Sequence, residues 1–323
     1  MTIALIEEIQ ASLGLSSEQM VRLIVRSPYT YKTYTIPKKS GGFRVIAQPA
    51  KETKLIQRWL ISNLFNKLPI HDCATAYKEG SSIKLNANKH RENEFLSKFD
   101  FIDFFQSIKE EDIKAHLMEC LGGFLSEKEV AWVARLSCIK TQTSKNLCLS
   151  VGAPSSPLLS NSAMFQFDSK LNNWCQENGI IYTRYADDLT FSSSIKGASA
   201  EIEGAIQNVL TEMARPKLLL NNKKTIHVSK KHQRRITGII INNEDELSLG
   251  RERKRMISAL IHKFTLNQLA SFEIFRLQGL LGFSKDVEPA FLIRMRDKYG
   301  SGVIEMILKI RKDNNGKNGD FNS

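Results

Sequence analysis

The spacing of apolar and polar residues along the chain changes period several times, and each change marks a predicted element. Residues 2–27 carry apolar side chains at helical spacing, and Ser16 followed by Gln19 is typical of a capping box that begins a second helix. Residues 29–48 alternate in steps of two around a Lys-Lys-Ser-Gly-Gly turn. This alternation predicts a β-hairpin with a basic tip.

Helical patterns occupy much of the remaining chain. Residues 49–68 return to the helical period, with Leu55 among the positions expected to face a core. Residues 109–147 are predicted to form two helices, and a glycine-containing loop at 151–157 leads into one long helix. The pattern after residue 250 is helical as well, which predicts a separate helical region at the carboxyl end.

Three further stretches have the pattern of strands. Residues 73–78 form a short apolar run, and residues 98–107 begin as an apolar strand that contains Asp100 before they turn toward a helix. Residues 180–192 consist of two runs rich in β-branched and aromatic residues on either side of Ala186-Asp187-Asp188. This last pattern predicts a β-hairpin with two carboxylates at its tip.

The three acidic residues in these strands indicate a metal site. Asp100 stands between two phenylalanines, and a buried carboxylate needs a cation beside it. A strand with one aspartate beside a hairpin with two would form a cup of oxygen ligands for two Mg²⁺ ions, with Phe101 next to them. Two such ions can bind the attacking and the leaving oxygen of a phosphoryl transfer. The alternative for an isolated Asp-Asp pair is a solvated surface turn.

Several motifs resemble those of one enzyme family. Tyr185-Ala186-Asp187-Asp188 resembles the catalytic box of reverse transcriptases, residues 100–105 resemble their first aspartate motif, and residues 151–157 resemble their nucleotide-facing loop. Asn86-Ala87-Asn88-Lys89-His90 is similar to the Asn-Ala-x-x-His box of the bacterial retron reverse transcriptases. Ile236-Thr237-Gly238 stands where that group usually has Val-Thr-Gly. The resemblance covers most of the chain.

The resemblance implies an α+β right-hand polymerase fold with fingers, an antiparallel-sheet palm and a small helical thumb. Residues 1–95 would form N-terminal helices and fingers, and residues 96–244 the palm, with a further fingers segment at about 109–148. Residues 245–311 would form the thumb. The polar, glycine-rich residues 312–323 are expected to be a disordered tail.

The resemblance also implies roles for individual residues. The catalytic and metal-binding set comprises Asp100, Phe101, Asp187 and Asp188. The residues expected to bind the incoming nucleotide are Arg44, Asp103, Phe104, Phe105, Gly152, Ala153, Pro154 and Lys224. The primer grip would be Ile236, Thr237 and Gly238, and the RNA contacts would be Asn86, His90, Arg251, Arg253, Lys254 and Arg255.

Some of these assignments have alternatives or departures from the family pattern. Of the two adjacent phenylalanines, Phe105 is expected to pack against the sugar and exclude a ribose 2′-hydroxyl, so that the product is DNA. Val151 replaces the family's usual glutamine and cannot hydrogen-bond the sugar, which leaves the backbone of Gly152 and Ala153 to form that wall. Asn86 and His90 are alternatively a buried hydrogen-bonded pair, and the Arg251–Arg255 run a solvated helix face.

Composition supports a nucleic-acid partner. The chain of 323 residues has 46 Lys and Arg against 34 Asp and Glu, a net charge of +12, which favours a polyanion. No apolar stretch approaches the roughly 20 residues needed to span a membrane, and no secretory leader is expected. The five cysteines are an odd set without a Cys-x-x-Cys pair, which fits a reducing cytoplasm.

The resemblance implies RNA-templated DNA synthesis from dNTPs. As a retron enzyme, the chain would bind a cognate structured noncoding RNA and begin DNA from the 2′-hydroxyl of an internal guanosine. The branched RNA–DNA product (msDNA) would serve anti-phage defence together with an effector protein. The alternatives are another small bacterial reverse transcriptase, of the group II intron or diversity-generating kind, and a non-catalytic RNA-binding scaffold.

Overall fold

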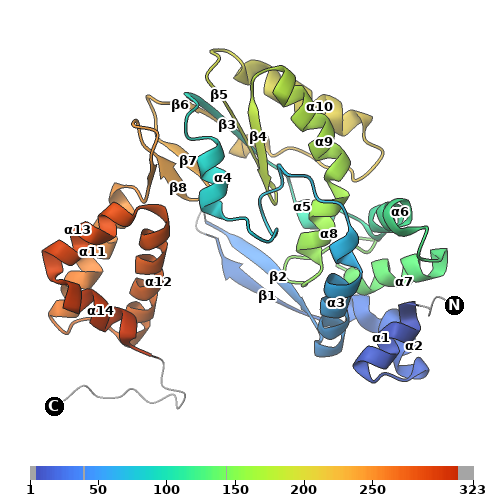
Figure 1. The fold of residues 1–323 in the computed structure, drawn as a ribbon. Helices are drawn as coiled ribbons and strands as arrows, with labels where there is room; N and C mark the ends of the chain where they lie inside the picture. Colours follow the sequence, from blue (N-terminus) through green and yellow to red (C-terminus); the bar gives the residue numbers. More distant parts are fainter. Residues whose placement is uncertain (1–4, 39–40, 143, 312–323) are drawn as a thin grey trace. The chain divides into compact units, whose positions relative to one another are not determined.

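The chain forms two compact units in a computed structural model that describes residues 5–38, 41–142 and 144–311. Unit 1 comprises residues 1–82 and 93–227, and unit 2 comprises residues 83–92 and 228–323. One short segment from the first third of the chain therefore belongs to the carboxyl-terminal unit (Figure 1). The tail predicted at 312–323 and part of the basic hairpin tip lie outside the described residues.

A four-stranded sheet lies at the centre of unit 1. Its strand order is β4-β5-β3-β6, with β3 at Phe95–Asp100, β4 at Ile181–Tyr185, β5 at Asp188–Ser193 and β6 at Ile226–Ser229. Strand β5 pairs antiparallel with both β3 and β4. The predicted hairpin at 180–192 is therefore confirmed, and the strand that carries the first aspartate lies beside it.

Helices, some of them in contact with this sheet, build most of the rest of unit 1. They are α1 (Leu5–Leu13), α2 (Ser17–Arg26), α3 (Lys51–Asn63), α5 (Phe104–Ser107), α6 (Glu110–Leu121), α7 (Glu127–Ser137), α8 (Ser156–Ala163), α9 (Phe165–Glu177) and α10 (Ser199–Glu212). Figure 1 shows α9 and α10 alongside the sheet. The single long helix expected after the glycine-containing loop is divided in two, because Met164 has a non-helical ψ of 3°. In the part of the chain described here, no helix combines the length and the apolar character needed to cross a bilayer.

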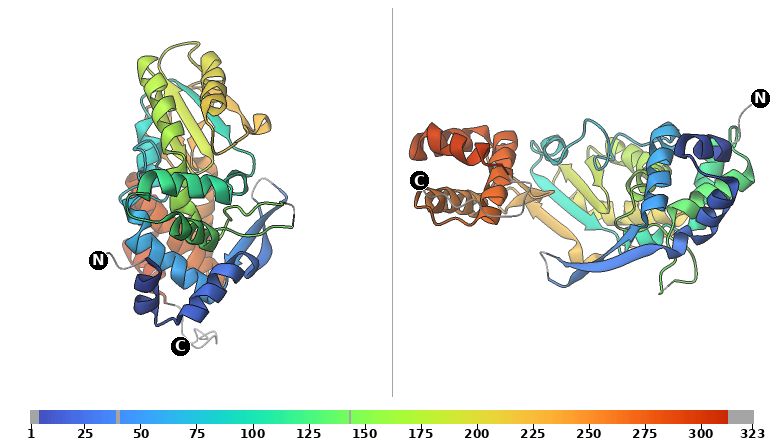
Figure 2. Two further views of the ribbon diagram at one scale, coloured as in Figure 1. Left: turned by 90° about the vertical axis from the view of Figure 1, so that its right-hand side faces the viewer. Right: turned by 90° about the horizontal axis from the view of Figure 1, so that it is seen from below.

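The amino-terminal region follows most of the predicted pattern. The capping box of Ser16 and Gln19 is present, and strands β1 (Tyr31–Pro37) and β2 (Phe43–Pro49) form the predicted antiparallel hairpin. Figure 2 draws the two strands of this hairpin as blue arrows that run side by side. One predicted core position is wrong: Leu55 is 49% exposed. Gln57 occupies the inward face of α3 instead, because its amide donates a hydrogen bond to the Leu136 carbonyl at 2.8 Å.

Residues 73–78 do not form the predicted strand. Ala74 makes a single parallel bridge to Arg184, and the chain then turns. Tyr77 has a positive φ of 57°, which ends any extended conformation at that point. The segment nevertheless borders β4, because the Thr75 amide donates to the Arg184 carbonyl at 2.8 Å.

Unit 2 combines a small sheet with a helical region. The sheet contains β7 (Arg234–Ile236), β8 (Ile239–Ile241) and β9 (Leu247–Ser248), and α4 (Ile83–Lys89) packs against it. The helices that follow are α11 (Arg251–Thr265), α12 (Ser271–Val287), α13 (Pro289–Tyr299) and α14 (Ser301–Lys309). They appear in orange and red in Figure 2, and they confirm the predicted helical region at the carboxyl end.

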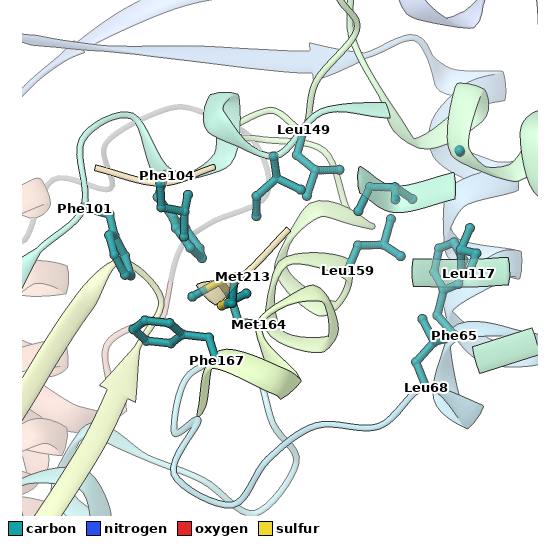
Figure 3. Close-up of a cluster of buried hydrophobic side chains, with 14 of the residues drawn as sticks. Phe65, Leu68, Phe101, Phe104, Leu117, Leu149, Leu159, Met164, Phe167 and Met213 are labelled. Atoms are coloured by element: carbon teal, nitrogen blue, oxygen red, sulfur yellow. The ribbon is translucent and has the colours of Figure 1, made fainter. Parts of the chain in front are cut away.

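Aromatic and aliphatic side chains from distant segments form the core of unit 1. Figure 3 shows Phe101, Phe104 and Phe167 gathered beside Met164 and Met213. The rings of Phe101 and Phe104 stack at 5.8 Å, and Phe167 meets Phe101 edge-on at 5.7 Å. The strand end that carries Asp100 is therefore anchored directly in the core.

A fully buried ion pair joins α9 to β4. The Arg184 guanidinium contacts the Asp168 carboxylate at 2.6 Å, and neither side chain has exposed surface. Tyr182 donates its hydroxyl to Asp168 at 2.9 Å, and Arg184 also donates to the Asn161 side-chain oxygen at 3.0 Å. Charges removed from water are tolerated only when they are paired and hydrogen-bonded in this way.

Asp168→Asn leaves the Arg184 guanidinium buried beside a neutral amide, so we expect a loss of about 3–5 kcal/mol in the free energy of unfolding. Urea denaturation measures this loss. Glu212→Gln is the matched control, because Glu212 pairs with Lys170 at 2.8 Å on the surface, where such a pair contributes about 0–1 kcal/mol. Similar losses in the two variants would contradict the importance of the buried pair.

Candidate active site

Three carboxylates lie together at one edge of the sheet in unit 1. In the antiparallel pairing of β3 with β5, Asp100 stands opposite Asp188, and in the pairing of β4 with β5, Tyr185 stands opposite Asp188. Asp187 occupies the turn between β4 and β5, and its carbonyl accepts a hydrogen bond from the Phe101 amide at 3.3 Å. Backbone pairing thus brings together acidic residues that are far apart in the sequence.

The turn itself has an unusual backbone conformation. Ala186 has a φ of 58°, a region that residues with a Cβ seldom adopt. Its carbonyl accepts a hydrogen bond from the Arg184 guanidinium at 3.2 Å. The buried ion pair therefore holds the backbone immediately before Asp187.

The carboxylates are crowded electrostatically. The pKa of Asp188 is raised to about 6, chiefly by burial and also by the nearby charges of Asp187 and Asp100, while Lys98 acts in the opposite direction. Burial and the Asp100 charge also raise the pKa of Asp187. Because like charges at this edge disfavour the ionised form, a cation placed among them would relieve the repulsion.

A lysine lies beside the first aspartate. Lys224, at the end of a short 3₁₀ turn (Asn222–Lys224), places its Nζ atom 2.8 Å from an Asp100 carboxylate oxygen. Burial alone would lower the pKa of Lys224, but the hydrogen bond and the surrounding carboxylates outweigh it, and the net direction is upward. The Asn221 amide donates to the Asp100 carbonyl at 2.7 Å, which fixes the turn to β3.

Among the described residues, no group of three or more His, Cys, Asp or Glu side chains is arranged to hold a metal ion. The three aspartates are neighbours at the sheet edge, but Asp100 faces Lys224. The donor set nevertheless fits a divalent ion, because it consists of carboxylate oxygens, and the pKa values of Asp187 and Asp188 are raised by burial and by the charges of neighbouring carboxylates.

A cleft of about 360 Å³ opens beside the aspartates. Arg44, Asp103, Phe105 and Val151 are among the residues that line it. Phe105 is partly exposed along the wall, whereas the ring of Phe104 is almost fully buried in the core. The two adjacent phenylalanines are therefore divided between core and cleft, as the sequence pattern suggested.

Gly152 is required where its loop meets the β1–β2 hairpin. It has a φ of 117°, and a Cβ at this position would lie 2.9 Å from the Ala47 carbonyl oxygen. The Val151 carbonyl accepts a hydrogen bond from the Ala47 amide at 2.8 Å, Ala153 is buried and Pro154 is partly buried. The predicted nucleotide loop is thus attached to strand β2.

The predicted primer-grip residues are the last residue of β7 and the two-residue turn between β7 and β8 in unit 2. Ile236 is buried, and Thr237 and Gly238 both have positive φ. The Thr237 hydroxyl donates to the Ile83 carbonyl at 3.3 Å, and the Gly238 carbonyl accepts from Arg253 at 3.1 Å. Helices α4 and α11 therefore both hold this turn.

The predicted RNA contacts in unit 2 occupy different environments. Asn86 is buried on α4 and His90 is buried directly after its end, and burial lowers the pKa of His90 to about 3, so its ring is neutral at physiological pH. Lys254 pairs with Glu288 at 2.6 Å, and Arg253 lies over the Phe283 ring. Arg251 and Arg255 are exposed.

Three residues that sequence reasoning did not single out also border the site. They are Tyr77, which lines the cleft, and Asn161 and Arg184, which hydrogen-bond beneath it. No sequence pattern marked them, because positive φ at a tyrosine and burial of an arginine are consequences of tertiary packing. An arginine directly before the catalytic box was the one available signal.

Comparison with known proteins identifies a family. Residues 36–241 match the family described as reverse transcriptase (RNA-dependent DNA polymerase). The chain is 38% identical over 307 residues to the retron Ec83 reverse transcriptase of Escherichia coli, which covers 94% of this chain and 97% of that protein. It is 32% identical over 296 residues to the retron Ec73 reverse transcriptase of Escherichia coli, which covers 88% and 90% respectively.

Among solved structures, telomerase from Candida albicans in complex with a TWJ fragment of telomeric RNA has a TM-score of 0.49 and 12% identity, and the match covers 93% of this chain and 59% of that one. The family match spans more than half of the chain, and reverse transcriptases in general depend on a divalent metal. The mixed helices and antiparallel sheets are those of the right-hand polymerase fold. The chain therefore belongs to the reverse transcriptase family and, within it, to the retron reverse transcriptases, which are RNA-directed DNA polymerases.

Proposed function

We propose that this chain copies part of a cognate structured noncoding RNA into DNA, with Asp100, Asp187 and Asp188 as its catalytic residues. The observation that carries the proposal is the register that sets Asp100 opposite Asp188, with Asp187 in the adjoining turn. The similarity to retron reverse transcriptases over nearly the whole chain supports it. The alternative, a non-catalytic RNA-binding scaffold, does not explain why mutually repelling carboxylates are placed beside an open cleft.

The three aspartates, with the main chain of Phe101, are the proposed ligands of two Mg²⁺ ions. When bound, these ions would supply the positive charge that activates a hydroxyl and stabilises the leaving pyrophosphate. Lys224 lies 2.8 Å from Asp100, close enough to exchange that contact for the pyrophosphate and to donate charge or a proton to it. Arg44 lines the same cleft, and its planar guanidinium suits the triphosphate.

The remaining cleft residues are proposed to select the nucleotide. Phe105 would pack against the sugar and clash with a ribose 2′-hydroxyl, while Phe104 supports it from the core at 5.4 Å. Asp103, which has a positive φ, begins the short helix that carries both rings. The backbone of Gly152 and Ala153, with Pro154, would form the opposite wall.

Unit 2 is proposed to hold nucleic acid. Ile236, Thr237 and Gly238 would support the growing end of the DNA. Arg251 and Arg255 are exposed and suited to phosphate contacts, which are salt-dependent and independent of sequence.

The other four residues of the predicted RNA-contact set are engaged within unit 2 or buried there. Arg253 and Lys254 would stabilise α11 and would assist RNA binding only indirectly. Asn86 and His90, which are buried, would influence RNA through the position of α4.

Membership of the retron reverse transcriptases also supports a proposal about the product. We propose that synthesis begins from the 2′-hydroxyl of an internal guanosine and yields a branched RNA–DNA hybrid that stays bound in the cytoplasm. An effector protein would join this complex in anti-phage defence. Sequencing the nucleic acid that co-purifies with the protein tests the priming step, since one short branched species is expected, and a mixed population of unbranched RNA would contradict it.

Asp187→Asn is expected to abolish DNA synthesis, with at least a roughly 10³-fold loss of kcat, because it removes charge where the reacting groups meet. Primer extension with dNTPs measures the loss, and filter binding should show RNA affinity nearly unchanged. Asp297→Asn, at an exposed position on α13, is the control. Loss of folding in the Asp187 variant would instead assign the carboxylate a structural role.

Phe105→Ala is expected to admit ribonucleotides, because the ring that meets the 2′-hydroxyl is gone. A single steric contact of this kind changes selectivity by roughly 10- to 100-fold. The ratio of kcat/KM for dCTP and CTP measures it. Phe124→Ala removes a 79% exposed ring outside the cleft and should leave the ratio unchanged; an unchanged ratio in Phe105→Ala would exclude that ring from the sugar site.

Mg²⁺ is expected to raise the melting temperature of the RNA-free protein, because it binds the folded carboxylates and not the unfolded chain. At 100 times its dissociation constant the contribution is about 2.7 kcal/mol. Asp100→Asn should remove most of the Mg²⁺-dependent shift, and a chelator should reverse it in the wild type. An equal shift in wild type and Asp100→Asn would place the bound ion elsewhere.

A further inference from the structure

Tyr77 has no role in the function derived so far, yet it is fixed at the edge of the catalytic cleft. Its side chain is 52% exposed and lines the cleft with Arg44 and Asp187. Its ring centre lies 6.4 Å from that of Tyr185, at an angle of 36°. The two tyrosines therefore form a partly exposed aromatic surface beside the catalytic turn.

The backbone at Tyr77 is held in a conformation that tyrosine rarely adopts. Its φ of 57° lies in the left-handed region, which is unfavourable for a side chain with a Cβ. Such a conformation persists only where surrounding contacts determine it. The Asn161 amide supplies one of them, since it donates a hydrogen bond to the carbonyl of the preceding residue, Ala76, at 2.7 Å.

The same buried cluster holds the catalytic turn. Asn161 accepts a hydrogen bond from Arg184 at 3.0 Å, and Arg184 donates to the Ala186 carbonyl at 3.2 Å. Ala186 and Tyr77, both with positive φ, are thus connected through Asn161 and Arg184. This arrangement fixes the Tyr77 backbone relative to the turn that carries Asp187, as a substrate-positioning group requires.

The order of elements across the sheet edge places Tyr77 on one particular side of the aspartates. Lys224 stands beside Asp100 on β3, the strand with Asp188 comes next, and Tyr185 ends the following strand, β4. The segment before Tyr77 borders that last strand. The aromatic pair and Lys224 therefore lie on opposite sides of the catalytic tip.

In-line phosphoryl transfer requires the attacking and the leaving oxygen to lie on opposite sides of the phosphorus atom. The proposed function assigns Lys224 to the leaving pyrophosphate. The attacking hydroxyl must then approach from the side of Tyr185 and Tyr77. An exposed aromatic ring at that place suits the sugar and base of a nucleotide, since stacking on aromatic side chains tolerates any base.

We propose that Tyr77 packs its ring against the nucleotide that carries the attacking hydroxyl, and that Asn161 is a positioning residue that holds Tyr77 in place. The inference rests on the proposed polymerase function and adds Tyr77 to the site that binds the priming strand. Its ligand is the terminal nucleotide of a primer strand, of any sequence.

Steady-state primer extension on a DNA primer annealed to an RNA template tests this assignment. Tyr77→Asn removes the ring and keeps a residue that tolerates positive φ, so the KM for primer–template should rise roughly 5- to 100-fold while the KM for dNTP changes less than about 2-fold. Tyr77→Phe should restore a KM near that of the wild type. A raised KM for dNTP alone, or no change in either constant, would overturn the proposal.

Two further variants distinguish the loss of the Tyr77 contact from a general loss of activity. Tyr29→Asn replaces a 64% exposed tyrosine outside the cleft and should leave both constants unchanged. Asn161→Asp keeps the acceptor for Arg184 but loses the donor to Ala76, so it should reproduce the selective rise in primer–template KM. A wild type that makes DNA neither on this primer–template nor on its co-purified RNA would refute the proposed function itself, whereas an active wild type with an unaffected Tyr77→Asn variant refutes only this inference.

Photocrosslinking tests the contact in the wild-type protein, without reliance on the folding of a variant. A primer ending in 5-iodouracil, annealed to an RNA template, is irradiated in complex with the enzyme. Trypsin releases residues 68–78, in which Tyr77 is the sole tyrosine. Crosslinking to this peptide is expected, and crosslinks confined to other peptides would overturn the assignment.

Discussion

The antiparallel pairing of β3 with β5 is the constraint on which the proposed catalytic site depends. Side chains alternate between the two faces of a strand, so a slip of one residue would turn Asp100 away from Asp188. The register is enforced by burial rather than by the aspartates, which repel one another. Phe99 stands opposite Leu189, and both are almost fully buried. Hydrophobic contacts beside the site therefore impose a proximity that electrostatics alone would oppose.

The buried cluster around Arg184 adds rigidity to that edge. A paired guanidinium and carboxylate in the interior contribute little net stability compared with apolar residues of the same size. The polar residues fix the orientation of the backbone instead, because Arg184 and Asn161 donate hydrogen bonds to carbonyls, which apolar side chains could not do. Those carbonyls belong to Ala186, which is itself left-handed, and to Ala76, which precedes the left-handed Tyr77. Backbone strain at the site is thus maintained by hydrogen bonds beneath it.

Unit 2 shows that a basic run in the sequence does not translate directly into a basic surface. Two of the cations at the start of α11 are engaged internally, Arg253 with the Gly238 carbonyl and Lys254 with Glu288. Those contacts fix the β7–β8 turn and the helix start, which leaves the neighbouring Arg251 and Arg255 exposed. The proposed function therefore divides positioning and phosphate binding among adjacent residues of one helix turn.

By itself, the sequence determined most elements and the identity of the acidic residues, because hairpins, capping boxes and apolar periodicity depend on local spacing. The hairpin around Asp187, the Ser16 cap and the helical carboxyl-terminal region were all predictable in this way. Only the tertiary structure decided that Gln57 replaces Leu55 in the core and that residues 73–78 turn at Tyr77. It also decided that Asn86 and His90 are buried. The inward position of Gln57 and the turn at Tyr77 depend on partners that are distant in sequence, the Leu136 carbonyl and Asn161, and local spacing carries no information about such partners.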